Sequence, residues 1–321
     1  MHKATAAGMT LAITSALAFG TSGTLVKPML EGGWSPATIV IVRALLGGLI
    51  LLPPTLIALR GRWSAVWTAR WRIVGMGLVG VAGTQYLYFA SLQSIPVSTA
   101  LLIEYLAPVL LVAVAWVISR RRPAPAVLVG VCLAVGGLVL VIGPGALVPP
   151  DLLGTLYAFG ATVGCAIYFV VAARDARGLP PIALACLGLL LGAVALLAVA
   201  ALRLFPVTVS FADVAMFGGQ LPWWMPVALI AAIPTAFAYF SGITGAQLVG
   251  SRIASFLGLL EVVFASVLAW LVLGEALTAL QLIGGAVLIA GIVAVRSGGR
   301  DLPVSVAHEG AEGRPSTVAV S

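Results

Sequence analysis

The chain has 321 residues, of which 61% are hydrophobic and only 8% are charged, and its formal net charge is +7. Soluble domains carry about 25% charged residues, so this composition excludes an ordinary soluble domain and indicates a polytopic helical membrane protein. A transmembrane β-barrel would show alternating segments of about ten residues. Here the apolar runs are continuous and about twice that length. The positive charge does not indicate a nucleic-acid partner, because the arginines form short clusters between apolar runs.

The apolar runs predict ten membrane-spanning helices, each long enough to cross a bilayer. They cover roughly residues 8–29, 35–58, 72–92, 96–118, 124–142, 152–173, 181–204, 223–245, 251–273 and 277–296. Most connections are short. The longest, residues 205–222, is moderately apolar and is expected to lie on the membrane surface. Residues 298–321 lack periodicity and are rich in Gly, Ser, Pro and charge, so they are expected to form a disordered cytoplasmic tail.

The arginine clusters orient these spans. With the N terminus in the cytoplasm, every inner loop contains arginine. The only basic residues of the outer connections are then Lys27 and Arg203, both at span ends. Cytoplasmic loops carry an excess of Lys and Arg. We therefore expect a multi-pass protein of the cell membrane with both termini in the cytoplasm.

An internal repeat is visible in the sequence. Residues 108–116, PVLLVAVAW, align with residues 262–270, VVFASVLAW, and the same shift aligns several Gly and Gln positions further out. The expected fold is an all-α membrane protein with ten transmembrane helices arranged as two five-helix repeats, residues 1–146 and 147–297. Because five is odd, the two repeats must have opposite orientations in the membrane. Inverted repeats of this kind are common in secondary transporters, whose sites lie at the bilayer midplane.

The stretch that follows Gly258, LLEVVFASVLAWLVLGEALTALQLIGGAVLIAGIVAV, resembles the signature of the EamA family in the drug/metabolite transporter superfamily. IEYLAPVLLVAVAWVISRRRP in the first half is a degraded copy. The sequence departs from this signature at two places. Val262 stands where the family usually has Pro, and Ser119-Arg120-Arg121 replaces Leu-Gly-Glu in the first half. The resemblance implies ten helices, export of amino acids or related metabolites, and alternating access.

Three charged residues lie deep within these spans, where charge is expensive and marks functional sites. Arg43 and Glu104 lie about 12 Å from the outer ends of their spans. The two could grip a zwitterion or form a standing ion pair that locks two helices. Glu261 and Glu104 fall about one turn apart on equivalent faces of the two repeats, so they could carry a proton or serve as hydrogen-bonded structural groups. Tyr157 and Tyr239 are the preferred aromatic residues lining a substrate site.

The function predicted from the sequence is secondary transport of a small molecule, an amino acid or a related metabolite, across the lipid bilayer. A non-transporting membrane sensor or scaffold is the alternative, and an intramembrane enzyme is a third possibility. An enzyme is disfavoured because no internal His, aspartate pair or metal-ligand cluster is present. Without a Walker A pattern, ATP-driven pumping by this chain is not expected either. We expect no cofactor, no metal and no nucleic-acid partner, and the oligomeric state is left open.

Overall fold

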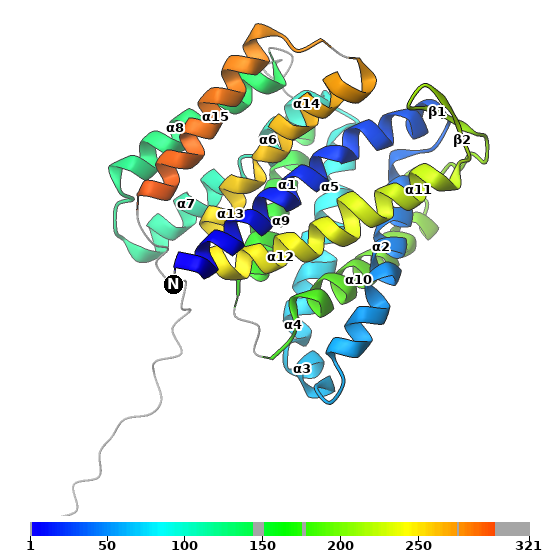
Figure 1. The fold of residues 1–321 in the computed structure, drawn as a ribbon, viewed down its shortest axis with the longest axis horizontal. Helices are drawn as coiled ribbons and strands as arrows, with labels where there is room; N and C mark the ends of the chain where they lie inside the picture. Colours follow the sequence, from blue (N-terminus) through cyan, green and yellow to red (C-terminus); the bar gives the residue numbers. More distant parts are fainter. Residues whose placement is uncertain (1, 144–150, 175–177, 275, 299–321) are drawn as a thin grey trace, which may run out of the picture.

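The structure of the protein is a computed structural model that describes residues 2–143, 151–174, 178–274 and 276–298. Within these residues, ten helical stretches are long and apolar enough to cross a membrane (Figure 1). They are Thr5–Glu31, Pro36–Ala58, Arg70–Ser91, Val97–Ser119, Pro125–Ile142, Leu152–Ala173, Pro181–Ala201, Trp224–Val249, Ser251–Val272 and Ala279–Ser297. The ten helical spans expected from the sequence are confirmed, with ends that differ by a few residues.

Several of these spans are built from more than one helical element. In the first half the elements are α1 (His2–Glu31), α2 (Pro36–Ala58), α3 (Trp63–Thr68), α4 (Arg70–Val74), the π-helix η1 (Gly75–Gly83), α5 (Thr84–Ser91), α6 (Val97–Glu104), α7 (Ala107–Ser119) and α8 (Pro125–Ile142).

The second half repeats this composition and adds a β-hairpin. Its elements are α9 (Leu152–Ala173), α10 (Pro181–Ala201), β1 (Val214–Met216), β2 (Gly219–Leu221), α11 (Trp224–Ala231), the π-helix η3 (Ala232–Phe237), α12 (Ala238–Val249), α13 (Ser251–Gly258), α14 (Leu260–Leu273) and α15 (Ala279–Ser297).

Local sequence signals explain where many helices begin. The side chain of Ser35 accepts the backbone N–H of Thr38 and caps α2, and Asp151 caps α9 in the same way through Gly154. A capping box joins Thr278 and Gln281 at the start of α15. Such caps satisfy N–H groups that a helix leaves without an intrahelical partner.

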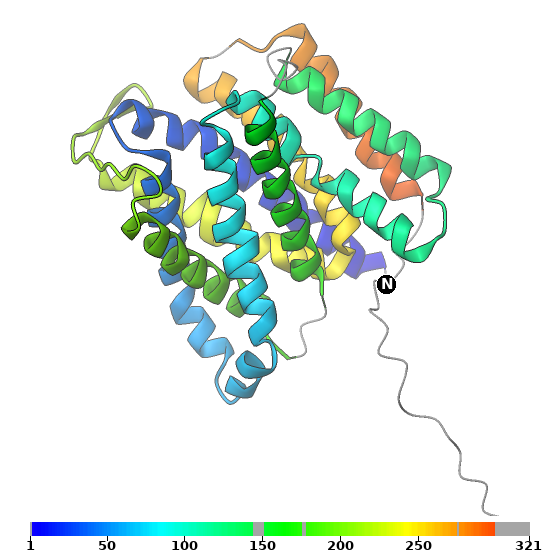
Figure 2. The same ribbon diagram turned by 180° about the vertical axis from the view of Figure 1, so that it is seen from behind.

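Close helix packing relies on glycine. The helix pairs α8–α15, α2–α10 and α1–α12 lie side by side (Figures 1 and 2). A Cβ added to Gly137 would lie 2.4 Å from the backbone nitrogen of Leu288, and one added to Gly291 would lie 2.5 Å from that of Ala134. Neither position of the α8–α15 contact can therefore accept a side chain, and small residues are what allow membrane helices to approach closely.

The boundaries of the last three spans of each half repeat at one fixed shift. Each of α4, α5, α6 and α8 begins 154 residues before its counterpart, which is α11, α12, α13 and α15 respectively. The same shift relates the last residues of α6 and α13, Glu104 and Gly258, and of α7 and α14, Ser119 and Leu273. These repeated boundaries are what two copies of one structural unit would give, and the inverted orientation of the halves stays a prediction.

The long connection between α10 and α11 contains a β-hairpin that the sequence did not predict. β1 and β2 pair antiparallel, and the turn residues Phe217 and Gly218 have φ angles of 53° and 79°. Positive φ at both central residues is the requirement of a type I′ hairpin turn. We call the end of the molecule that carries this hairpin the hairpin side, and the opposite end, where α1 begins and α15 finishes, the terminal side (Figure 1).

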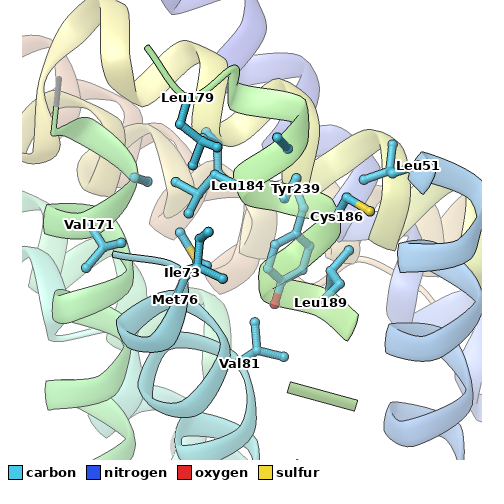
Figure 3. Packing of buried hydrophobic residues seen from close by; sticks show 14 of the residues in the cluster. Leu51, Ile73, Met76, Val81, Val171, Leu179, Leu184, Cys186, Leu189 and Tyr239 are labelled. Atoms are coloured by element: carbon cyan, nitrogen blue, oxygen red, sulfur yellow. The ribbon is translucent and has the colours of Figure 1, made fainter. Parts of the chain in front are cut away.

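The largest apolar core joins α2, α10 and α12 with the terminal-side half of the third span. Figure 3 shows part of it, with the ring of Tyr239 among these apolar side chains and its hydroxyl directed toward Val81. Tyr239 therefore packs its ring in the core and directs its hydroxyl toward the third span. Two expectations cannot be compared with the fold: the boundary between the two repeats at 146 and 147, and all but the first residue of the tail, lie outside the described residues.

Candidate functional site

Two membrane spans are interrupted near their middle, and an acid lies at each interruption. In the fourth span, α6 ends at Glu104 and α7 begins at Ala107. Pro108 explains this break, because it lacks the N–H that would bond to the carbonyl of Glu104 and its ring clashes with that carbonyl in a continuous helix. The carbonyl of the preceding residue, Ile103, accepts a 2.7 Å hydrogen bond from the hydroxyl of Thr162 on α9. A neighbouring span thus bonds to the backbone directly beside the break.

The ninth span is interrupted at the equivalent point, although Val262 replaces proline there. α13 ends at Gly258, α14 begins at Leu260, and only Leu259 lies between them. The backbone N–H groups of Leu259 and Val262 each bond three residues back, to Phe256 and Leu259, at 3.1 and 3.2 Å. This tight turn places Glu261 in the first turn of α14.

Glu261 is surrounded by groups that favour a negative charge. The Tyr105 hydroxyl acts as a hydrogen-bond donor to its carboxylate, and Arg43 of α2 interacts with it electrostatically. Its position near the N-terminus of α14 adds the positive end of a helix dipole. Helix α1 approaches closely here, since a Cβ on Gly20 would lie 3.2 Å from the Glu261 carbonyl oxygen.

Glu104 lies in a different environment. It interacts electrostatically with Glu261, and Tyr88 and Cys165 face it. In the described part of the chain, no donor is hydrogen-bonded to its carboxylate. Its place at the C-terminus of α6 adds the negative end of a helix dipole. Glu104 at the end of α6 therefore offers a carboxyl group whose oxygens no described donor occupies.

Arg43 of α2 is linked to α1 and to Glu261. Its guanidinium donates one hydrogen bond, of 3.1 Å, to the hydroxyl of Ser22 on α1. It interacts electrostatically with Glu261 and with Tyr239, but no carboxylate of the described residues lies within the 4 Å of an ion pair. The standing Arg43–Glu104 ion pair, one of the two alternatives left open by the sequence, is therefore not present.

Aromatic rings complete this group on the side of α9 and α12. The rings of Tyr168 and Tyr239 meet edge to face with centroids 5.7 Å apart, and Phe19 of α1 contacts Tyr239 at 5.4 Å. We use the name central cluster for Arg43, Tyr88, Glu104, Tyr105, Tyr168, Tyr239 and Glu261. The cluster can present a free acid, a cation with spare donors and several phenol hydroxyls to one polar solute.

Two π-helical segments flank the central cluster, η1 in the third span and η3 in the eighth. In each, a threonine hydroxyl bonds to the carbonyl five residues earlier: Thr84 to Val79 and Thr235 to Ile230, both at 2.9 Å. These segments end 154 residues apart, at Gly83 and Phe237. Wide helical turns of this kind occur frequently at functional sites.

Four of the five site residues singled out from the sequence come together in the central cluster: Arg43, Glu104, Tyr239 and Glu261. The fifth, Tyr157, lies on the same face of α9 as Tyr168 but roughly 16 Å closer to the hairpin side. Within the described residues, no hydrogen bond or ring contact joins Tyr157 to the cluster.

Sequence reasoning gave too little weight to Tyr105 and Tyr168. One signal for Tyr105 was present, because it directly follows Glu104 and stands three residues before Pro108, where the helix must break. Tyr168 stands eleven residues, three helical turns, beyond Tyr157 and therefore on the same face of α9. Nothing in the sequence indicated that Cys165 faces both acids.

Comparison with known proteins identifies the family. The profile of the EamA-like transporter family matches the chain twice, at residues 6–143 and at residues 152–297. The chain belongs to the EamA-like transporter family. The two matches correspond to the two five-span halves, and each covers one complete half of this EamA-like fold as the structure describes it.

Individual relatives agree with this assignment. The chain is 25% identical to the uncharacterized transporter YwfM of Bacillus subtilis, over 90% of this chain and 93% of that protein. It is 30% identical to the threonine/homoserine exporter RhtA of Escherichia coli K12, over 66% of each chain. A solved crystal structure superposes with a TM-score of 0.72 and 21% identity, covering 90% of this chain and 96% of the other, which shows a shared fold. This EamA-like protein is accordingly a multi-pass membrane protein of a transporter family.

Proposed function

We propose that the protein is a secondary transporter that exports amino acids or related small metabolites by alternating access, with both termini in the cytoplasm. The observation that carries the proposal is the central cluster. An acid without a hydrogen-bond donor, Glu104 at a helix interruption, and a cation with spare donors, Arg43 on α2, belong to this one cluster and are not paired with each other. Interrupted helices that present charged groups at the midplane are typical of transporter substrate sites.

The different environments of the two acids support different roles for them. Glu104 has no donor among the described residues and lies at a helix C-terminus, so it binds the ammonium group of the substrate. Arg43 binds the carboxylate through the N–H groups that Ser22 leaves free. Glu261 already has Tyr105 as a donor and Arg43 as a nearby cation. It therefore acts mainly by holding Arg43 and Tyr105 in position.

The tyrosines line the path of the substrate. Tyr239 contributes its hydroxyl, which interacts electrostatically with Arg43. Tyr157 lines the approach from the hairpin side along α9. The ten side chains from Leu260 to Ala269 on α14 are all half-buried, whereas Ala254–Leu257 on α13 are all buried. The hairpin-side half of this span is therefore the more loosely packed one, which suits a segment that moves during transport.

The orientation in the membrane is tested by single cysteines at Ser64 and Ser210, in a background without Cys132, Cys165 and Cys186. Ser64 lies in the connection between the second and third spans, and Ser210 in the connection that carries the hairpin. An impermeant thiol reagent applied outside the cell should label position 210 and spare position 64. The reverse labelling pattern would contradict cytoplasmic termini.

The transport activity is tested by counterflow in proteoliposomes with a panel of labelled amino acids. Uptake of at least one amino acid against preloaded unlabelled compound is expected, and Glu104→Gln should lose most of it. Absence of counterflow for every amino acid and related metabolite, by protein that is folded and correctly inserted, would support the alternative of a membrane sensor or scaffold. Chemical conversion of the compound in place of exchange would support an enzyme.

A further inference from the structure

A narrow cleft adjoins the central cluster on its hairpin side. It lies between α1, α2 and α11, and Arg43 forms part of its wall. The remaining lining residues are one tryptophan and five aliphatic side chains or methionine: Met29, Trp34, Ile39, Val42, Val227 and Ile230. The lining residues are therefore apolar except for Arg43 and Trp34.

The indole N–H of Trp34 is a buried donor without an acceptor among the described residues. The residue is only 5% exposed, and its Nε1 has no hydrogen-bond partner among the described residues. The ring stacks on Trp223, with centroids 6.4 Å apart and an interplanar angle of 28°. In this conformation the cleft is too narrow to hold a water molecule. A buried donor without an acceptor is costly, and such groups in native structures call for a functional explanation.

Arg43, which also lines the cleft, has unused donors. A guanidinium carries five N–H groups, and its one hydrogen bond within the described residues goes to Ser22. The two polar side chains that line the cleft therefore carry only donors, one of them charged, and no acceptor side chain lines it. The chemistry that satisfies two donors between apolar walls is a carboxylate on a small apolar body.

We propose that this cleft is the carboxylate subsite of the substrate, with Trp34 Nε1 as the second donor beside Arg43. The inference rests on the proposed function and narrows it to carboxylate-bearing solutes with a small apolar body next to the carboxylate. The cleft opens when α1, α2 and α11 separate, and the carboxylate then pairs both donors. Closing of the cleft behind the departed solute leaves Trp34 Nε1 without a partner, as observed here.

Thermal unfolding of the detergent-solubilised protein tests the subsite without measuring transport. Sodium butyrate should raise the melting temperature of the parent, whereas n-butylamine at the same concentration should not. Trp34→Phe keeps the ring and removes the N–H, so it should require about tenfold more butyrate for the same shift, as expected from the loss of a hydrogen bond to a charged group. Arg43→Gln should abolish the shift.

The matched control is Trp223→Phe, which alters the stacking partner of Trp34 without touching the donors of the cleft. This variant should respond to butyrate like the parent. The proposal is overturned if Trp34→Phe responds like the parent, if Trp223→Phe loses the response equally, or if butylamine acts like butyrate. A Trp34-dependent butyrate shift in a protein that exchanges no amino acid would support the subsite and contradict the proposed function, so the two failures are distinguishable.

Discussion

The fourth and ninth spans have the same architecture but reach it differently. Both begin and end at positions 154 residues apart, and both are interrupted after the same number of residues. The fourth has Pro108 and leaves two residues outside the helices, whereas the ninth has Val262 and leaves one. Proline therefore widens the interruption but is not required for it. The acids also differ, because Glu261 follows its interruption at a helix N-terminus and Glu104 precedes its own at a helix C-terminus.

The largest expected effect is a difference in amino-acid affinity between the Gln variants of the two acids. Glu104→Gln should weaken amino-acid binding about ten- to a hundredfold, because a hydrogen bond to a charged group contributes about 1.5–3 kcal/mol. Glu261→Gln should reduce affinity by a smaller factor, since its carboxylate acts through Arg43 and Tyr105. Counterflow KM values of the two variants, at equal folded yield, measure this difference. Equal losses in both would remove the distinction between a binding acid and a positioning acid.

A second comparison exchanges the features of the two interruptions. Pro108→Ala restores the missing N–H and should let the fourth span close its break, which moves Glu104 and lowers counterflow severalfold. Val262→Pro should be tolerated, because the ninth span is already interrupted at the matching position. Counterflow rates of the two variants measure these effects, and circular dichroism confirms their helix content. Loss of folding in Val262→Pro together with parent-like transport in Pro108→Ala would show that the interruptions are not equivalent.

The smallest expected effect concerns the residue that ends each of these spans. Arg120 and Gly274 both adopt left-handed backbone conformations, with φ of 53° and 71°. A side chain in this conformation costs about 1 kcal/mol, so Arg120→Gly should stabilise the protein slightly and Gly274→Ala should destabilise it by a similar amount. Melting temperatures in detergent measure both changes. Shifts of the same sign in the two variants would contradict the equivalence of these positions.

Much of the fold follows from the sequence because apolar length is a strong physical signal. Every span was predicted, and the 154-residue shift between the repeats first appears in the alignment of Pro108–Trp116 with Val262–Trp270. The β-hairpin was missed because its turn, Phe217-Gly218, lacks the usual Asn-Gly or Asp-Gly signal. The π-helical segments were missed as well, because hydropathy does not distinguish a π-helix from an α-helix.

The candidate site was predicted only in part. A charge deep in an apolar span is visible in sequence, which identified Arg43, Glu104 and Glu261. The partners of those charges depend on how helices rotate against one another, and hydropathy does not determine this. Tyr105 as the donor to Glu261, and Trp34 beside Arg43, therefore required the structure.

The central claim, that Glu104 and Arg43 hold opposite ends of a zwitterion, is tested most directly by ligand specificity. The measurement is competition in counterflow between the best amino acid of the panel and its two analogues, one without the ammonium group and one without the carboxylate. The parent should prefer the amino acid over both. Glu104→Gln should lose only its preference over the analogue without the ammonium, and Arg43→Gln only its preference over the analogue without the carboxylate. Both variants retaining the full preferences of the parent would contradict the claim.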